Sequence, residues 1–204
     1  MLRLIKSANF IFAIVISNAA FLLSASAHAR DIEITPYIGQ IFSSELVNSL
    51  DATEVEVGDA NHYGLAIAWQ DSPNGQGQIL INTASHDFIS SSDLQEHSFD
   101  VTYAHFSGVA QFRQRDYVTT VSLGLGGAYF QTDNKDEIYP SLTIAVGTRY
   151  ELSKNFAIVT ELRGYASYIE DDNQLFCEGT SCHALLEESI WLEGAISVGF
   201  AFKF

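Results

Sequence analysis

Apolar and polar residues alternate with a period of two along most of the chain after about residue 30, and no stretch keeps a helical period over a useful length. Because neighbouring side chains of a strand point to opposite faces, this alternation predicts strands with one apolar face. Each run has roughly the ~9–11 residues that a tilted strand needs to cross a membrane. The eight runs are 32–42, 62–70, 77–86, 98–110, 117–130, 140–152, 156–168 and 190–204.

The connections between these runs alternate between short and long. The short ones contain turn signals such as Asn-Gly, and they lie at 71–76, 113–116 and 152–155. The long ones lie at 43–60, 87–97, 131–139 and 169–189, and they hold seventeen of the 25 acidic residues. This pattern is typical of outer-membrane barrels, with short periplasmic turns and longer extracellular loops. It predicts an all-β, eight-stranded antiparallel up-and-down barrel with one acidic rim.

The composition of the two faces indicates which face is inside. In the run 140–152, Leu142, Ile144 and Val146 alternate with small residues such as Ser141 and Thr143. A secreted lipocalin-like barrel would also have eight strands of period two. However, its water-facing surface would carry many charges, whereas the interior of a narrow barrel favours small residues. We therefore expect a transmembrane barrel with its apolar face turned to lipid.

Aromatic residues should then gather at the two ends of the lipid-facing strips. Ordinary β-propensity also enriches aromatics in strands, but their positions fit two girdles better. The expected loop-side girdle is Tyr63, Tyr129 and Tyr168, and the expected turn-side girdle is Trp69, Tyr117, Tyr150, Phe202 and Phe204.

The N-terminus has the order of a cleavable signal peptide. Arg3 and Lys6 precede an apolar run at 10–23, and "SASAHA" supplies small residues for cleavage after Ala29. The alternative, a membrane anchor, needs about 20 apolar residues, and this run is shorter. We expect a signal peptide at 1–29 and a barrel domain at 30–204. Cleavage would change the net charge from −15 to −17, which argues against nucleic acid as a partner.

The signal peptide, the eight alternating runs, the acidic loops and the terminal "GFAFKF" together resemble the small OmpA/OmpX-type outer-membrane barrels over residues 30–204. The resemblance implies a monomer in the outer membrane of a Gram-negative bacterium, in contact with lipid and lipopolysaccharide. It also implies that the barrel-assembly machinery reads the aromatic C-terminus, with Phe204 recognised and Phe202 and Phe200 on the same face. Such barrels have many functions, so the resemblance concerns architecture more than activity.

Several charged residues fall on the face of small residues and are expected in the lumen. They could form an ion path or binding pocket, or a salt-bridged plug. We expect the plug, because eight strands leave room for side chains rather than for an aqueous channel. The residues are Glu33, Asp100, Arg149, Glu151, Glu161, Arg163, Glu193 and Lys203.

One short motif is consistent with an enzyme. In "YAHFSG", His105 and Ser107 share one face of a strand, and this His-x-Ser resembles the outer-membrane lipid A deacylases, whose serine is activated by a neighbouring histidine. No carboxylate stands out as the third, orienting group. The topology also places His105 in the periplasmic half, whereas lipid A occupies the outer leaflet. We expect a structural or surface-binding, adhesion-type barrel without cofactor, with this esterase and a small passive pore as alternatives.

The two cysteines lie in "CEGTSC", in the longest connection. An exported chain meets an oxidising compartment, so we expect a local disulfide between Cys177 and Cys182. A zinc site that includes His183 lacks a fourth ligand and the usual spacing. The acid-rich stretches 133–137 and 170–173 lack the pattern of an EF-hand loop. We expect these acids to be solvated loop charges, with weak binding of a divalent cation as the alternative. The acidic loops could also bind an extracellular ligand.

Overall fold

The computed structural model describes residues 32–44, 46–47, 54–55, 57–89, 95–132, 135–169, 177–178, 181–182 and 189–204. The predicted signal peptide lies outside these residues and stays a prediction. The described part of the chain contains no helix that is long and apolar enough to cross a membrane.

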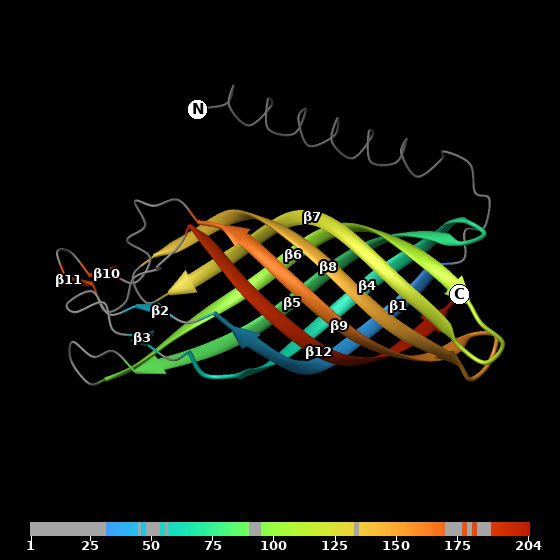
Figure 1. Ribbon diagram of the computed structural model, residues 1–204, viewed down its shortest axis with the longest axis horizontal. Helices are drawn as coiled ribbons and strands as arrows, with labels where there is room; N and C mark the ends of the chain where they lie inside the picture. Colours follow the sequence, from blue (N-terminus) through green and yellow to red (C-terminus); the bar gives the residue numbers. More distant parts are fainter. Residues whose placement is uncertain are drawn as a thin grey trace, which may run out of the picture. The chain divides into compact units, whose positions relative to one another are not determined.

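Eight long antiparallel strands close into a barrel in the order β1-β12-β9-β8-β7-β6-β5-β4, so each strand neighbours its sequence partner among the long strands and β12 closes the seam on β1. This confirms the predicted fold. Figure 1 shows these strands running obliquely around the barrel. Their bounds are β1 (Ile32–Ser43), β4 (Ala60–Ser72), β5 (Gly75–Ile89), β6 (Glu96–Arg113), β7 (Val118–Thr132), β8 (Asp136–Glu151), β9 (Phe156–Tyr168) and β12 (Ile190–Lys203).

The three short connections are tight turns, as predicted. Between β4 and β5, Ser72 pairs with Gly75, which leaves a two-residue turn. In the described parts of the long connections there are four two-residue strands that the periodicity did not reveal, and Figure 1 shows them at one end of the barrel. These are β2 (Leu46–Val47), β3 (Glu54–Val55), β10 (Cys177–Glu178) and β11 (Ser181–Cys182). We call this the loop end and the opposite one the turn end.

The alternation of β8 has the predicted facing. Ile144 is 57% exposed on the outside, whereas Thr143 is 1% exposed inside the barrel. The reason is space, because eight strands enclose a lumen that only small or well-fitted side chains fill. Glycines extend this fit: a Cβ on Gly199 would lie 2.7 Å from the ring of Tyr37, and one on Gly39 would lie 2.6 Å from Nε2 of His62.

The two expected aromatic girdles lie at the two ends of the outward apolar band. Tyr63 and Tyr168 are exposed near the loop end, and Tyr117 and Tyr150 are exposed near the turn end. Between them, large apolar side chains are exposed on every long strand. The outward apolar positions include Ile38, Leu65, Ile81, Phe106, Leu125, Ile144, Leu162 and Ile196.

The polarity of β5 and β6 inverts near the loop end. There Phe99, Val101 and Tyr103 are buried inside the barrel, while Asp100 is exposed and Thr102 half-exposed on the outside. Beyond the apolar band, the outer face of the β5–β6 hairpin is therefore mostly polar, and its inner face carries Phe88 and Phe99 beside His86. The expectation that Asp100 faces the lumen is wrong, because the apolar residues on either side of it fill the interior and turn its carboxylate outward.

Candidate functional site

Near the turn end, the lumen holds a salt bridge between β1 and β8. Arg149 Nη1 lies 2.5 Å from Glu33 Oε1, and both side chains are buried. Arg149 Nε also lies 3.5 Å from Glu151 Oε1, although the Glu151 side chain is half exposed at the mouth. Lys203 is also partly exposed at the turn end. Glu151 and Lys203 thus border the lumen rather than fill it.

A second buried pair lies farther along the lumen, on β9. Arg163 Nη2 lies 2.8 Å from Glu161 Oε1, and Arg163 Nε donates to the same oxygen at 2.9 Å. Arg163 Nη1 also donates to the Thr143 hydroxyl at 3.1 Å. Because i and i+2 share one face of a strand, a single strand can supply both partners of this pair. A buried charge of this kind needs such a partner to be tolerated.

Near the loop end, Glu193 of β12 receives three hydrogen-bond partners. Its Oε1 accepts from the Ser43 hydroxyl at 2.7 Å and lies 3.0 Å from His86 Nε2. Its Oε2 accepts from the Tyr103 hydroxyl at 2.6 Å. The side chains of His86 and Glu193 are both fully buried. The period of two predicted Glu193 in the lumen. His86 was not among the predicted lumen residues, although its inward position on β5 follows from the same parity.

An apolar cluster lies beyond Glu193, and we call it the cap. The rings of Phe99 and Phe130 pack edge-on against Trp191, with ring centroids 5.9 and 6.1 Å apart. Leu46 and Val57, from the connection between β1 and β4, belong to the same cluster. Among the described residues, polar pairs in the lumen are thus followed by apolar packing toward the loop end.

The connection between β1 and β4 is attached to the barrel close to the cap. Val57 forms a β-bridge with Phe88, and the amide of Gly58 donates to the Asp87 carbonyl at 2.8 Å. The Gly58 carbonyl in turn lies 3.2 Å from Nδ1 of His86. This connection is therefore held by both backbone and side-chain contacts.

His105 and Ser107 both point into the barrel and are buried. The two ring nitrogens of His105 and the hydroxyl of Ser107 have no hydrogen-bond partner among the described residues. The two side chains therefore do not form a hydrogen-bonded dyad. A Cβ on Gly124 would lie 2.1 Å from Ser107 Oγ, which shows how closely the serine packs on the neighbouring strand. This arrangement neither activates the serine nor exposes it on the outer surface.

The C-terminal aromatic residues lie at the seam where the barrel closes. The Phe204 amide donates to the Ile32 carbonyl at 2.9 Å. The side chains of Phe200, Phe202 and Phe204 are all exposed on the outward face. Their role as an assembly signal stays a prediction.

The side chains of Cys177 and Cys182 lie outside the described part of the structure, and the disulfide stays a prediction. The backbone does place the two residues directly opposite each other in the β10–β11 ladder. Opposite residues of an antiparallel pair have Cα atoms about 4.5–5.5 Å apart, which is within the range that a disulfide spans. In the described part of the chain, no group of three or more histidine, cysteine or acidic side chains could hold a metal ion.

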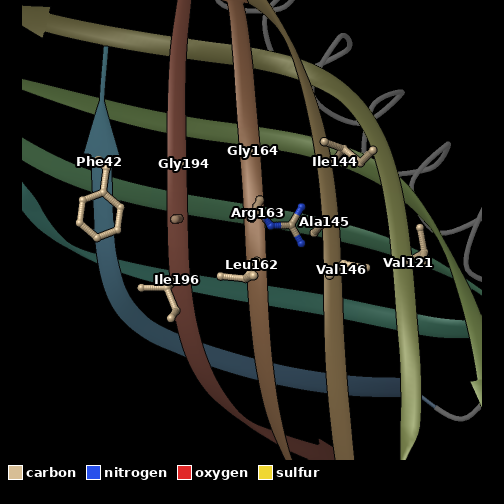
Figure 2. A pocket seen from close by; sticks show the side chains of 11 residues that line it. Phe42, Val121, Ile144, Ala145, Val146, Leu162, Arg163, Gly164, Gly194 and Ile196 are labelled. Carbon is tan, nitrogen blue, oxygen red and sulfur yellow. The ribbon is translucent and has the colours of Figure 1, made fainter. Parts of the chain in front are cut away.

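The outward face carries a shallow groove of about 490 Å³. Gly194 of β12 pairs with Gly164 of β9, so two adjacent positions lack a side chain. Figure 2 shows this bare stretch, with Phe42 on one side of it and Ile144 on the other. The groove interrupts the apolar band without making it polar.

No family model and no curated protein matches the sequence, but several solved β-barrels match the fold. Neisserial surface protein A superimposes with a TM-score of 0.56 at 12% identity, over 85% of this chain and 97% of that chain. The attachment invasion locus protein Ail of Yersinia pestis, in complex with a heparin analogue, gives a TM-score of 0.48 at 16% identity, over 85% and 99%. The N-terminal barrel domain of Pseudomonas aeruginosa OprF gives 0.44 at 16% identity, over 85% and 98%. The chain is thus an eight-stranded barrel that resembles neisserial surface protein A in its fold.

Proposed function

We propose that the protein is an integral outer-membrane barrel with a closed lumen. In this proposal, the barrel binds partners at the cell surface through its acidic loops. The observation that carries this proposal is the outward apolar band. Leu125 and Ile144 are 69% and 57% exposed, and similar side chains surround the barrel. A continuous apolar surface of this extent is rare on monomers in water, and lipid is the environment that satisfies it.

The borders of the band support the same reading. Outward-facing tyrosines lie near both ends of the band, and the outer wall of the β5–β6 hairpin turns polar beyond it. Aromatic rings prefer the interface between lipid and water, and polar side chains prefer the aqueous phase beyond it. We place the loop end outside the cell, because the longer loops of such barrels are extracellular.

Membrane insertion is tested with the two tryptophans. Trp69 is on the outward face near the turn end, whereas Trp191 is 1% exposed inside the cap. In vesicles with brominated acyl chains, we expect strong quenching of Trp69 and little of Trp191, so that Trp69→Phe removes most of the quenching. Equal quenching of both residues, or no quenching of the wild type, would contradict a lipid-facing outer wall.

The charge of the loop end supports a positively charged ligand. Seventeen of the 25 acidic residues lie in the four long connections. Such a surface attracts cations at long range, and salt weakens this attraction. The buried, uncoupled positions of His105 and Ser107 support a binding role rather than the esterase alternative.

The ligand class is tested by the binding of a basic peptide, and of heparin as its anionic counterpart, to the vesicle-inserted barrel. We expect the peptide to bind, its affinity to fall as salt rises, and a variant with the six acids of 169–189 changed to amides to bind it less well. Equal binding by that variant, or a preference for heparin, would refute an electrostatic binding surface while leaving the barrel itself unaffected.

A further inference from the structure

Among the described residues, three buried histidines lie in the lumen, and their hydrogen-bond partners differ. Nδ1 of His62 lies 2.8 Å from Asn82 Oδ1, and Nε2 lies 3.0 Å from the Ser197 hydroxyl. The Asn82 oxygen accepts, but a hydroxyl both donates and accepts. A neutral His62 therefore satisfies both contacts. Neither ring nitrogen of His105 makes a hydrogen bond among the described residues.

His86 differs because both of its ring nitrogens face acceptors. Nε2 lies 3.0 Å from the Glu193 carboxylate, and Nδ1 lies 3.2 Å from the Gly58 carbonyl. A neutral imidazole has one N–H, so it can satisfy only one of these acceptors, whereas the imidazolium has two. The Ser43 hydroxyl lies 3.3 Å from Nδ1 but gives its hydrogen to Glu193. The arrangement therefore favours a protonated His86. Glu193 also needs this charge, because it is a fully buried carboxylate whose ionic partner in the described structure is His86.

The other groups around His86 do not replace this charge. Glu193 from β12 is the titratable group in direct contact, and Tyr103 from β6 acts through it. Asp87, the next residue of β5, is exposed on the outer side. β1 contributes the Ser43 hydroxyl, and the ring of Phe99 from β6 stacks on the imidazole with centroids 5.2 Å apart.

We infer that His86 is a proton-dependent latch, which ties Gly58 of the first long connection to Glu193 of the barrel wall and so holds the cap closed. Gly58 follows Val57, which packs in the cap together with Leu46. Tightening or loosening this contact therefore changes how firmly the connection between β1 and β4 is held at the loop end. The consequence for ligand binding rests on the proposed function, since that connection is part of the acidic binding surface.

The latch loses its hold when His86 loses a proton. The single remaining N–H stays on Nε2, because the bond to a carboxylate is stronger than one to a neutral carbonyl. The lone pair of Nδ1 then faces the lone pairs of the Gly58 carbonyl, and that contact is lost. The closed form thus holds one more proton than the open form, so the closed form is favoured at low pH and is lost as the pH rises.

The test is hydrogen exchange at the Gly58 amide, which donates to Asp87. It uses the full barrel refolded in vesicles, with exchange rates corrected for the intrinsic effect of pH. Between pH 5.5 and pH 8.5 we expect protection of the wild type to fall by about tenfold, as for the loss of one hydrogen bond. Constant protection over this range would overturn the latch. Insertion is checked separately, so a barrel that fails to insert counts against the proposed function instead.

Two variants and one control separate a latch from a merely structural contact. In Glu193→Gln, the glutamine amide can donate to Nε2 of His86. A neutral His86 then carries its hydrogen on Nδ1 and donates it to the Gly58 carbonyl, so we expect high protection of the Gly58 amide at both pH values. In His86→Phe, which keeps a ring against Phe99, we expect low protection at both. The control His62→Gln should retain the response of the wild type. A Glu193→Gln barrel with the wild-type response would refute the inference even if His86→Phe did not fold.

Discussion

The substitution Ile144→Arg tests most directly whether the apolar band of this barrel lies in lipid. Ile144 faces outward near the middle of β8, whereas Ile138 faces outward on the same strand near the loop end. Both side chains are more than half exposed, at 57% and 74%. An arginine at either position therefore meets no packed protein core, and the environment outside the barrel decides its cost.

The expected difference follows from depth. The two positions are six residues apart along the strand. At about 3.3 Å per residue this is roughly 20 Å along the strand, or about 15 Å along the membrane normal for a strand tilted by about 40°. An arginine costs about 2–4 kcal/mol at the bilayer midplane and about 0–1 kcal/mol near an interface. We expect Ile144→Arg to lower the free energy of unfolding by about 2–4 kcal/mol and Ile138→Arg by less than about 1 kcal/mol.

The assay is reversible denaturant unfolding in lipid vesicles, followed by the fluorescence of Trp191, which leaves a buried environment on unfolding. In a water-soluble barrel, both positions would face solvent and both arginines would be nearly neutral. Equal costs for the two variants, or a cost below about 0.5 kcal/mol for Ile144→Arg, would refute the lipid-facing assignment.

Three further predictions concern the seam, the longest loop and the lumen. Deleting Phe204 should leave export intact but reduce the amount of heat-modifiable barrel in the outer membrane, and unchanged assembly would remove its role as a signal. The double change Cys177→Ser and Cys182→Ser should leave heat-modifiability nearly unchanged but increase protease cutting within 170–188 on intact cells, and mass spectrometry of unreduced peptides should find a disulfide in the wild type. Gly199→Ala should cost about 1–3 kcal/mol in unfolding experiments, because its Cβ would meet a tyrosine ring, whereas Gly194→Ala on the same strand meets nothing within 4 Å and should be nearly neutral.

The strand count, the tight turns and the facing of most strands were predictable from the sequence alone. Alternation places Thr143 and Ile144 on opposite faces wherever β8 lies, because successive side chains of any strand diverge. Volume then decides that the face with threonine is the inner one. Local chemistry of this kind needs no knowledge of the partner strands, and it also placed Glu33, Arg149, Glu161, Arg163 and Glu193 in the lumen.

The tertiary structure decided which side chains meet across the lumen and where the polarity of the wall inverts. His86 and Glu193 are 107 positions apart, and the closure and register of eight strands bring them to 3.0 Å. Asp100 was misplaced because its side depends on how far the β5–β6 hairpin extends beyond the apolar band, which is not a property of its neighbours in sequence. A period of two assigns a residue to a face, but only the closed barrel determines the depth of that residue and its partners on the opposite wall.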